Sequence, residues 1–559
     1  MRKSAASALV AITALALVLR LSPLARFVYF GSDVGEYFRI SQGLVGTGHV
    51  SLAYAGWGVT YPYFPGMYFL VAGTTFGGLE LSGSLGLVVP AIAALVPALV
   101  FLIAARVLRE DTAALVAAAF VAVAMPLVFQ TAHPIPATVG EVLAVAALVL
   151  FLRLPADPKA WALLVPTTVA LVVTHHLAAY FLIVMLLIAV ALRAIVRPAP
   201  VPGLRSQAAY VAFLTALALG FWLGYATTFR TNILADVDVQ PWWLPLAALP
   251  ALVLVLAGIV VARRRIAWRY RPAYSTSRRV LTTYVAALVA ILALVGAAVA
   301  VGIPGTTIRL SPAVLWYFLP LFGFIALAGS GRRHLDFAGR GLEVSGWFLA
   351  IVLSIGFGAL AAPRVLIPYR HIEFALLALA LPVGAGFART VELGNLDRRR
   401  FAAFAFAGVL VAGSAVTAFP PTGVLVGFEE GARPAAVSSA YWVRGNVDGL
   451  LATDHRGSTL AFGFGGADAT WDAARLTLVA DSFADAEAEM RSVHAPSGDR
   501  RVDFVMIDAD LVQGVQFFPW EPARPLGGAA REKFASAPYV KVFDSGYAQV
   551  YWVDWGLAP

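Results

Sequence analysis

The sequence predicts a polytopic α-helical membrane protein with a soluble domain at its C-terminus. Hydrophobic residues make up 60% of its 559 residues and charged residues only 13%. Apolar runs close to the roughly twenty residues that cross a bilayer recur along most of the chain. The final part is acidic instead. The chain has no cysteine, which excludes disulfides, thiolate metal sites and cysteine nucleophiles.

Hydropathy and turn signals predict thirteen membrane spans. We interpret the first as an uncleaved span, because Arg20 and Arg26 follow it closely and no small-residue cleavage site ends it. The predicted spans cover residues 5–25, 82–104, 112–130, 136–154, 160–175, 177–195, 207–226, 243–261, 280–302, 312–329, 344–362, 369–388 and 401–419.

The distribution of basic residues predicts the orientation. With the N-terminus inside, 23 Lys and Arg residues fall on the cytoplasmic side, against seven on the outer side. The seven are Arg20, Arg26, Arg39, Arg230, Arg309, Arg364 and Arg370. This bias follows the positive-inside rule. It predicts a cytoplasmic N-terminus and an extracytoplasmic C-terminus in the plasma membrane.

The apolar run over residues 63–76 is too short to be a fourteenth span. It has about fourteen residues and follows a segment rich in Tyr and Pro, which is typical of a helix lying at the membrane interface. We therefore place it in a long first loop, residues 26–81, on the outer side. The predicted membrane domain covers residues 1–421.

Residues 422–559 form the predicted extracytoplasmic domain, which follows Phe419-Pro420-Pro421. They carry 18 acidic and 11 basic residues, a net charge of −7. Because the whole chain has a net charge of +9, residues 1–421 carry +16. We expect an α/β or α+β domain with a helix ending at Arg491, a buried strand over 502–507 and a hairpin over 540–553. It contains no Rossmann or Walker glycine motif.

Ionisable residues at the outer ends of the spans are the candidates for chemistry, because a charge at a membrane is costly and needs a reason. Asp33 and Glu36 lie three residues apart just after the first span, and Glu141 begins an apolar one. A carboxylate there could act as a general base or a metal ligand. Arg370 and His371 begin a late span, where an arginine could hold a phosphate.

Each of these residues also has a simpler explanation. Asp33 and Glu36 fit a capping box for a helix beginning at Val34. Glu141 could be solvated at the interface, and Arg370 could pair with Glu373 one turn later. Adjacent His175 and His176 diverge by about 100° on a helix, so they cannot chelate one ion as a local pair. We expect one of them to line the cavity.

The order of these motifs resembles the GT-C class of integral-membrane glycosyltransferases, in the branch of the oligosaccharyltransferase catalytic subunit. The family's acidic motif in the first outer loop matches Asp33, with Glu36 nearby, and its second acidic position matches Glu141. Its interfacial Tyr-Pro-rich helix is approximated by Tyr61-Pro62-Tyr63-Phe64-Pro65, and its donor-phosphate arginine matches Arg370. The resemblance covers most of the chain.

The resemblance implies transfer of a hexose or pentose from a polyprenyl-phosphate-linked donor to an acceptor on the outer face. Asp33, Glu36 and Glu141 would be catalytic, and Arg370 and His371 would bind the donor phosphate. The remaining expected cavity residues are His133, His175, His176 and Tyr61. Mg²⁺ or Mn²⁺ could bind Asp33, Glu36 and Glu141 through oxygen.

One departure from the family's pattern narrows the range of expected acceptors. The oligosaccharyltransferase branch carries a Trp-Trp-Asp-Tyr-Gly motif, which has no equivalent after residue 420. Tyr441-Trp442-Val443-Arg444 and Thr453-Asp454-His455-Arg456-Gly457 occupy the comparable region without matching it. This favours transfer of a monosaccharide or other glycan to a lipid-linked or cell-surface acceptor over transfer to asparagine.

Four alternatives stay open at the level of sequence. They are a polymerase or ligase of lipid-linked glycans, which Arg370-His371 would also suit, an oligosaccharyltransferase-like enzyme, a lipid-linked glycan transporter, and a non-catalytic scaffold. A transporter would need charged residues at mid-membrane depth and often repeated halves, neither of which is evident. The expected partners are membrane lipid, the lipid-linked donor and a glycan, lipid or protein acceptor, with no nucleic acid.

Overall fold

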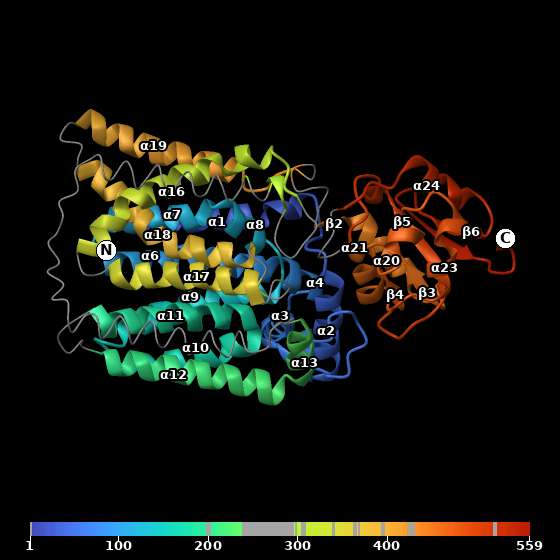
Figure 1. Cartoon of the computed structure of the whole chain (residues 1–559), viewed down its shortest axis with the longest axis horizontal. Coiled ribbons are helices and arrows are strands. Elements are labelled where there is room, and N and C mark those ends of the chain that lie inside the picture. The colour runs from blue at the N-terminus through green and yellow to red at the C-terminus, as the bar shows by residue number, and fades with distance from the viewer. Residues whose placement is uncertain are drawn as a thin grey trace.

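The computed structural model describes residues 3–196, 203–236, 296, 299–302, 309–337, 341–361, 366, 369–392, 397–421, 424, 431–517 and 523–558. Figure 1 shows two parts, a long bundle of roughly parallel helices and a smaller α/β domain at one end of it. The N-terminus lies at the end of the bundle away from this domain. We call the other end the domain end.

The bundle contains helices that match the predicted spans. Seven helical segments of the described residues are long and apolar enough to cross a membrane, or eight if the pair α7 and α8, bent by 58°, is one span. Pro126, the second residue of α8, explains the bend, because proline has no backbone N–H with which to continue a preceding helix. The bundle helices are α1 (Lys3–Leu21), α4 (Leu81–Gly83), α5 (Val89–Ile92), α6 (Val96–Leu108), α7 (Asp111–Val123), α8 (Met125–Thr131), α9 (Pro136–Arg153), α10 (Trp161–Thr174), α11 (His176–Val196), α12 (Leu204–Gly220), α16 (Val314–Phe337), α17 (Gly341–Ala361), α18 (Tyr369–Glu392) and α19 (Asp397–Val416).

The prediction of a polytopic helical membrane protein is therefore confirmed, whereas the count of thirteen spans stays a prediction. The span predicted over 243–261 and most of the one over 280–302 lie outside the described residues. Each of the other predicted spans overlaps an observed helix, and most of their ends agree to within a few residues. The largest difference is at α16, which continues to Phe337 beyond the predicted end at 329. Hydropathy is a property of consecutive residues, which is why it locates spans well.

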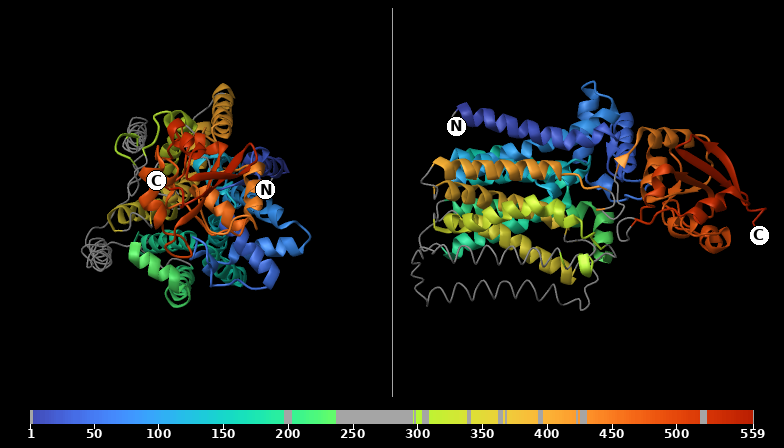
Figure 2. Two further views of the ribbon diagram at one scale, coloured as in Figure 1. Left: turned by 90° about the vertical axis from the view of Figure 1, so that its right-hand side faces the viewer. Right: turned by 90° about the horizontal axis from the view of Figure 1, so that it is seen from above.

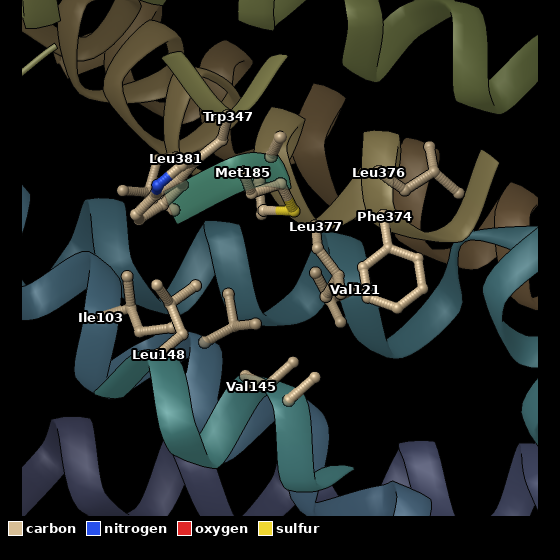
Figure 3. Packing of buried hydrophobic residues seen from close by; sticks show 14 of the residues in the cluster. Ile103, Val121, Val145, Leu148, Met185, Trp347, Phe374, Leu376, Leu377 and Leu381 are labelled. Carbon is tan, nitrogen blue, oxygen red and sulfur yellow. The ribbon is translucent and has the colours of Figure 1, made fainter. Parts of the chain in front are cut away.

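The bundle core is packed with aliphatic and aromatic side chains from α6, α7, α9, α11, α17 and α18 (Figure 3). Trp347 and Phe374 lie there beside Met185 and Leu148 around a cavity of about 20 Å³. A cavity of that size holds about one water molecule, and an apolar one stays dry. The core therefore acts as a rigid support for the polar groups at the domain end.

The first loop forms a compact layer across the domain end of the bundle (Figures 1 and 2). It contains β1 (Tyr29–Phe30), α2 (Val34–Thr47) and α3 (Gly66–Phe76). With 11 residues, α3 is too short to cross a bilayer, as predicted for this segment. A further short helix, α13 (Thr227–Asp236), lies at the same end.

The C-terminal domain is built on a five-stranded sheet in the order β4-β3-β5-β7-β6. β3 is parallel to both β4 and β5, whereas β7 is antiparallel to β5 and β6. The predicted helix, strand and hairpin correspond to α23, β5 and β6–β7. The elements are β2 (Gly431–Ala432), α20 (Pro434–Val443), β3 (Leu450–Ala452), α21 (His455–Gly463), β4 (Ala469–Thr470), α22 (Ala474–Thr477), α23 (Phe483–Arg491), β5 (Val502–Asp508), α24 (Gly528–Glu532), β6 (Tyr539–Asp544) and β7 (Ala548–Val553). The predicted domain boundary after residue 421 adjoins residues that lie outside the described ones.

Helix α21 of this domain docks on α2 of the first loop. A Cβ atom at Gly35 would overlap the carbonyl oxygen of Thr459, and one at Gly463 would overlap the backbone of Gly35. The rings of Phe38 and Phe464 stack beside this contact with centroids 4.2 Å apart. β1 also pairs with β2, which joins the two parts a second time. The two helix backbones approach so closely because both glycines lack a side chain.

Substituting Gly35 with alanine is expected to lower the free energy of unfolding by about 1–3 kcal/mol, because the added methyl group forces α2 and α21 apart. Thermal unfolding of the purified chain would measure it. Gly43→Ala, on the same helix with nothing within 4 Å of the added atom, is the matched control and should be neutral or slightly stabilising. Equal stability of both variants would contradict this account of the docking contact.

Candidate functional site

Asp33 lies directly before α2, in the seam between the first loop and the C-terminal domain. It occupies the N-cap position of α2 but makes no side-chain capping hydrogen bond. Its Oδ2 instead accepts hydrogen bonds from the hydroxyls of Tyr61, at 3.0 Å, and Tyr37, at 3.4 Å. The capping explanation of Asp33 therefore does not describe its contacts. The tyrosines hold the carboxylate in one orientation.

The second oxygen of Asp33 faces a histidine of the C-terminal domain. His455 Nε2 lies 3.2 Å from Asp33 Oδ1, and the His455 side chain is buried. Burial raises the pKa of Asp33, but the hydrogen bond and charge of His455, with the hydrogen bonds of Tyr61 and Tyr37, outweigh it and hold the pKa below its ordinary value. Asp33 is thus held as a carboxylate.

The start of α21 positions His455. Asp454 caps this helix, accepting a hydrogen bond from the Gly457 amide at 2.8 Å, and its other oxygen accepts one from the Gln516 amide at 3.3 Å. The His455 amide in turn donates to the Gln516 carbonyl at 3.2 Å. His455 also follows β3, at the carboxyl end of a parallel strand, where α/β sheets commonly place ligand-binding residues.

A buried ion-pair network fixes the same helix end. Arg456 donates to Asp508 at 3.1 Å and to Asp510 at 3.2 Å, and Arg433 also pairs with Asp510 at 3.1 Å. The Tyr547 hydroxyl adds a 2.8 Å hydrogen bond to Asp510. A paired buried arginine with several acceptors is tightly constrained. The network therefore holds the residue next to His455 in one position.

Glu36 lies in the first turn of α2, in a different environment from Asp33. Its Oε2 accepts hydrogen bonds from the Tyr54 hydroxyl, at 2.7 Å, and the Gly58 amide, at 3.1 Å. Its Oε1 is buried and has no hydrogen-bond partner among the described residues. Burial raises the pKa of Glu36, although the hydrogen bonds from Tyr54 and Gly58 oppose it. The environments of Asp33 and Glu36 thus shift their pKa values in opposite directions.

Glu141 lies inside the bundle. It is buried on α9, and neither of its carboxylate oxygens has a hydrogen-bond partner among the described residues. Its charge interacts with Arg20 on α1 and with Glu373 on α18. Arg20 is fully buried and donates to the carbonyls of Ala16, at 3.2 Å, and Ala122, at 3.4 Å. The sequence interpretation did not include Arg20 in the site.

Arg370 belongs to the same group of charges as Glu141. It lies near the start of α18 within electrostatic range of Glu373, His175 and His176. Both predictions for Arg370 therefore stay predictions. One places it in a cavity, and the alternative pairs it with Glu373. Its neighbour His371 points elsewhere, since its Nε2 hydrogen-bonds the Ser354 hydroxyl of α17 at 2.9 Å.

The three other histidines that the sequence analysis assigned to the cavity lie beneath the first loop. The His133 ring lies 4.5 Å from the Phe30 ring and its Nδ1 lies 2.8 Å from the Phe129 carbonyl. His175 Nδ1 accepts a hydrogen bond from the Ala178 amide at 3.2 Å, so it caps α11. The His176 ring packs against Phe64 and Phe229. The structure thus places the predicted residues in two groups, one around Asp33 and one around Arg370 and Glu141.

A divalent metal does not fit the predicted ligand set as the structure arranges it. Both oxygens of Asp33 are engaged by His455, Tyr61 and Tyr37. No cluster of three His, Asp or Glu residues that could hold a metal ion occurs in the described part of the chain. Asp33, Glu36 and Glu141 therefore do not converge as three ligands on one ion.

The contribution of His455 could not be identified from the sequence, although a signal was present. Asp454-His455-Arg456 follows an apolar run that reads as a short strand, which is the pattern of polar residues at a strand's carboxyl end. Nothing local connects that pattern to Asp33. Only the docking of α21 on α2 brings the two residues together.

Removing the charge of Glu36 is expected to change the pH dependence of stability. Because its folded pKa is raised, the folded protein binds the proton more tightly than the unfolded chain, and the free energy of unfolding falls as pH rises from the ordinary glutamate pKa towards the raised value. Glu36→Gln should remove this fall, which thermal unfolding between pH 5 and 8 would measure.

Glu36→Ala serves as the comparison for that variant. It leaves the Tyr54 hydroxyl and the Gly58 amide without their acceptor, at a cost of about 1–3 kcal/mol for each unpaired group. If the Glu36→Gln protein lost as much stability at neutral pH as the Glu36→Ala protein, the prediction that the pKa of Glu36 is raised would be wrong.

Solved structures with the same fold include two membrane glycosyltransferases. The oligosaccharyltransferase of Archaeoglobus fulgidus, tethered with an acceptor peptide containing the NVT sequon, is 15% identical, covering 100% of this chain and 75% of that chain with a TM-score of 0.57. Its complex with Zn and sulfate is 15% identical, covering 99% and 74% with a TM-score of 0.54. ArnT from Cupriavidus metallidurans in the apo state is 15% identical, covering 100% of both chains with a TM-score of 0.53.

Comparisons of sequence give no such similarity. No protein-family model matches the chain. No curated protein matches it at a significant level either. The comparison of structures therefore confirms the predicted resemblance at the level of the fold. The chain has the fold of the GT-C glycosyltransferases.

Proposed function

We propose that this protein is a membrane glycosyltransferase that transfers a hexose or pentose from a polyprenyl-phosphate-linked donor to a lipid-linked or cell-surface acceptor. The observation that carries the proposal is the Asp33 carboxylate, held by two tyrosines and His455 in a seam beside the membrane, on a fold that glycosyltransferases share. The excess of basic residues in the opposite loops supports a plasma-membrane orientation with this seam on the extracytoplasmic face.

The proposed reaction is a single displacement. The acceptor hydroxyl oxygen bonds to the anomeric carbon, the bond from that carbon to the donor phosphate oxygen breaks, and the hydroxyl proton passes to Asp33. The configuration at the anomeric carbon is inverted. Glycosyl transfer has an oxocarbenium-like transition state, in which the attacking hydroxyl becomes acidic as its bond forms. A carboxylate of low pKa is therefore a sufficient base, provided that it is ionised and correctly placed.

The two carboxylates of the first loop would play different parts. Asp33 has a lowered pKa and faces the seam, whereas Glu36 has a raised pKa and accepts hydrogen bonds from the Tyr54 hydroxyl and the Gly58 amide. Pairs of titratable groups whose pKa values are pushed apart are typical of sites with a divided acid and base role. We assign proton acceptance to Asp33 and positioning of the first loop to Glu36.

Arg370 is the group assigned to the departing phosphate. It lies in the first turn of α18, where the helix dipole adds positive potential. Glu141 and one histidine of the His175–His176 pair would line the same cavity, because both histidines lie within electrostatic range of Arg370, and Glu141 and Arg370 both act on Glu373. An arginine that balances charge on the phosphate as it leaves stabilises the transition state more than the ground state.

A peptide acceptor is the second candidate. The oligosaccharyltransferase of Archaeoglobus fulgidus has the same fold and has been solved with an acceptor peptide, and another structure of it holds Zn and sulfate. The Asp33 contacts described above do not provide a three-ligand metal site in this chain. Activity measured with and without EDTA would test whether transfer needs a divalent metal.

Asp33→Asn is expected to lower transfer by about 10²–10⁴-fold, because the amide cannot accept the acceptor proton. Mass spectrometry of surface glycans and lipid-linked intermediates would be compared in the host lacking this protein, complemented with the natural chain or the variant at equal membrane abundance. Glu80→Gln, an exposed acid of the same loop, is the control and should restore the glycans fully. Full restoration by Asp33→Asn would remove the base assignment and favour the transporter or scaffold.

Arg370→Gln is expected to lower transfer by about 10²–10³-fold, with accumulation of the unused lipid-linked donor, because the leaving phosphate loses its counter-charge. The same host complementation measures it. Arg230→Gln provides the matched control, since Arg230 is exposed and its side chain donates to the nearby Leu223 carbonyl at 2.8 Å. Similar losses from both variants would show a general effect of basic charge and no specific phosphate contact.

A further inference from the structure

The seam beside Asp33 contains two tryptophans from different parts of the chain. Trp57 comes from the first loop and Trp471 directly follows β4 of the C-terminal domain, and their ring centroids are 5.0 Å apart. Both side chains are partly exposed. The His494 ring meets Trp57 edge-on at 5.7 Å. We call Trp57, Trp471 and His494 the aromatic platform.

The platform is in contact with the candidate catalytic group. The His455 ring packs edge-on against Trp471 with centroids 5.3 Å apart, and the same ring pairs with Asp33 through Nε2 at 3.2 Å. Trp471 follows β4 and His455 follows β3, so both lie at the carboxyl ends of neighbouring parallel strands. Open α/β sheets bind their ligands at this edge.

Trp57 is held rigidly in its place. Its indole N–H donates to the Ala469 carbonyl of β4 at 3.1 Å. The next residue, Gly58, donates its amide to Glu36, and a Cβ atom at the preceding Gly56 would overlap the Glu36 carboxylate. The loop around Trp57 is thus fitted closely against Glu36. A partly exposed ring that is fixed in this way is preorganised for a ligand.

The indole N–H of Trp471 suggests what the platform binds. This nitrogen is buried and has no hydrogen-bond acceptor among the described residues. Buried indole N–H groups usually have a partner. A ligand with an apolar face for the rings and oxygens at its edge would satisfy both features. A sugar ring has this chemistry, with C–H groups on its face and hydroxyls around it.

We propose that the aromatic platform binds a pyranose ring of the acceptor, which makes the acceptor a glycan. The inference rests on the proposed function and narrows its acceptor class. The ring would lie on Trp57 and Trp471 with a hydroxyl oxygen accepting from the Trp471 indole, and a second hydroxyl would reach Asp33 past His455. Two fixed aromatic rings one contact from the base suit the C–H face of a pyranose ring better than an extended peptide or an alkyl chain.

The test uses the purified full chain in nanodiscs and saturation-transfer NMR. The probes are methyl α-pyranosides of glucose, mannose and galactose, with the peptide acetyl-Asn-Val-Thr-amide and octanol as rival acceptors. We expect saturation transfer to ring C–H protons of at least one pyranoside. Trp57→Ala and Trp471→Ala should each weaken its binding by about two- to tenfold, the effect of losing one aromatic contact.

Three controls separate the outcomes. Trp552→Ala, a tryptophan of β7 that is 41% exposed, should leave binding unchanged. Trp471→Phe keeps a ring but removes the N–H, so it should bind more weakly than the natural chain while its thermal unfolding is preserved. Asp33→Asn should bind the pyranoside more weakly but detectably, because it alters the hydroxyl contact at Asp33 and keeps both aromatic rings. Failure of the proposed transfer and failure of the platform are therefore observed separately.

The proposal is overturned if no pyranoside binds, if the peptide or octanol alone gives saturation transfer, or if Trp57→Ala and Trp471→Ala bind as the natural chain does. It is also overturned if Trp57→Ala, Trp471→Ala and Trp471→Phe lose binding only in proportion to a lowered thermal midpoint. That result would make the tryptophans packing residues between the first loop and the C-terminal domain.

Discussion

The close packing of α21 on α2 is the contact on which the candidate site depends. Gly35 and Gly463 let the two backbones approach, and the Thr459 hydroxyl donates to the Ser32 carbonyl at 2.5 Å beside them. Because both partners are helices, the contact fixes orientation as well as distance. The C-terminal domain contributes His455 and Trp471 to the seam. Their positions depend on this docking and on the buried Arg456 ion pairs that hold the start of α21.

The seam places two carboxylates of one helix in opposite electrostatic situations. Asp33 is surrounded by donors from three directions, whereas one oxygen of Glu36 is buried without a hydrogen-bond partner among the described residues. Burial raises the pKa of both groups. The hydrogen bond and charge of His455 outweigh burial at Asp33, whereas the charge of Asp33 adds to burial at Glu36. Residues three apart in sequence, which a capping box would treat as a matched pair, thereby acquire different chemistry.

Below the seam, the domain end of the helix bundle contains a further group of charged side chains. Arg20, Glu141 and Glu373 come from three different helices and interact electrostatically, above a core of closely packed apolar side chains. Buried charges in a membrane bundle are costly and usually mark a ligand path or a site. Their position suits a donor whose phosphate lies at the membrane surface while its lipid stays in the bilayer. The acceptor would then approach from the side of the C-terminal domain.

The sequence by itself located the long apolar helices among the described residues, the short helix α3 and the strands of the C-terminal hairpin, and it singled out Asp33 as a candidate. These follow from the hydropathy, periodicity and turn chemistry of consecutive residues, which act locally. Tertiary structure alone decided that Asp33 does not cap α2, that His371 bonds Ser354 inside the bundle, and that Arg20 joins Glu141. It also brought His455 to Asp33 across a docking contact whose hydrogen-bonded residues are 427 positions apart. Such pairings depend on which surfaces pack together, and no local pattern encodes that choice.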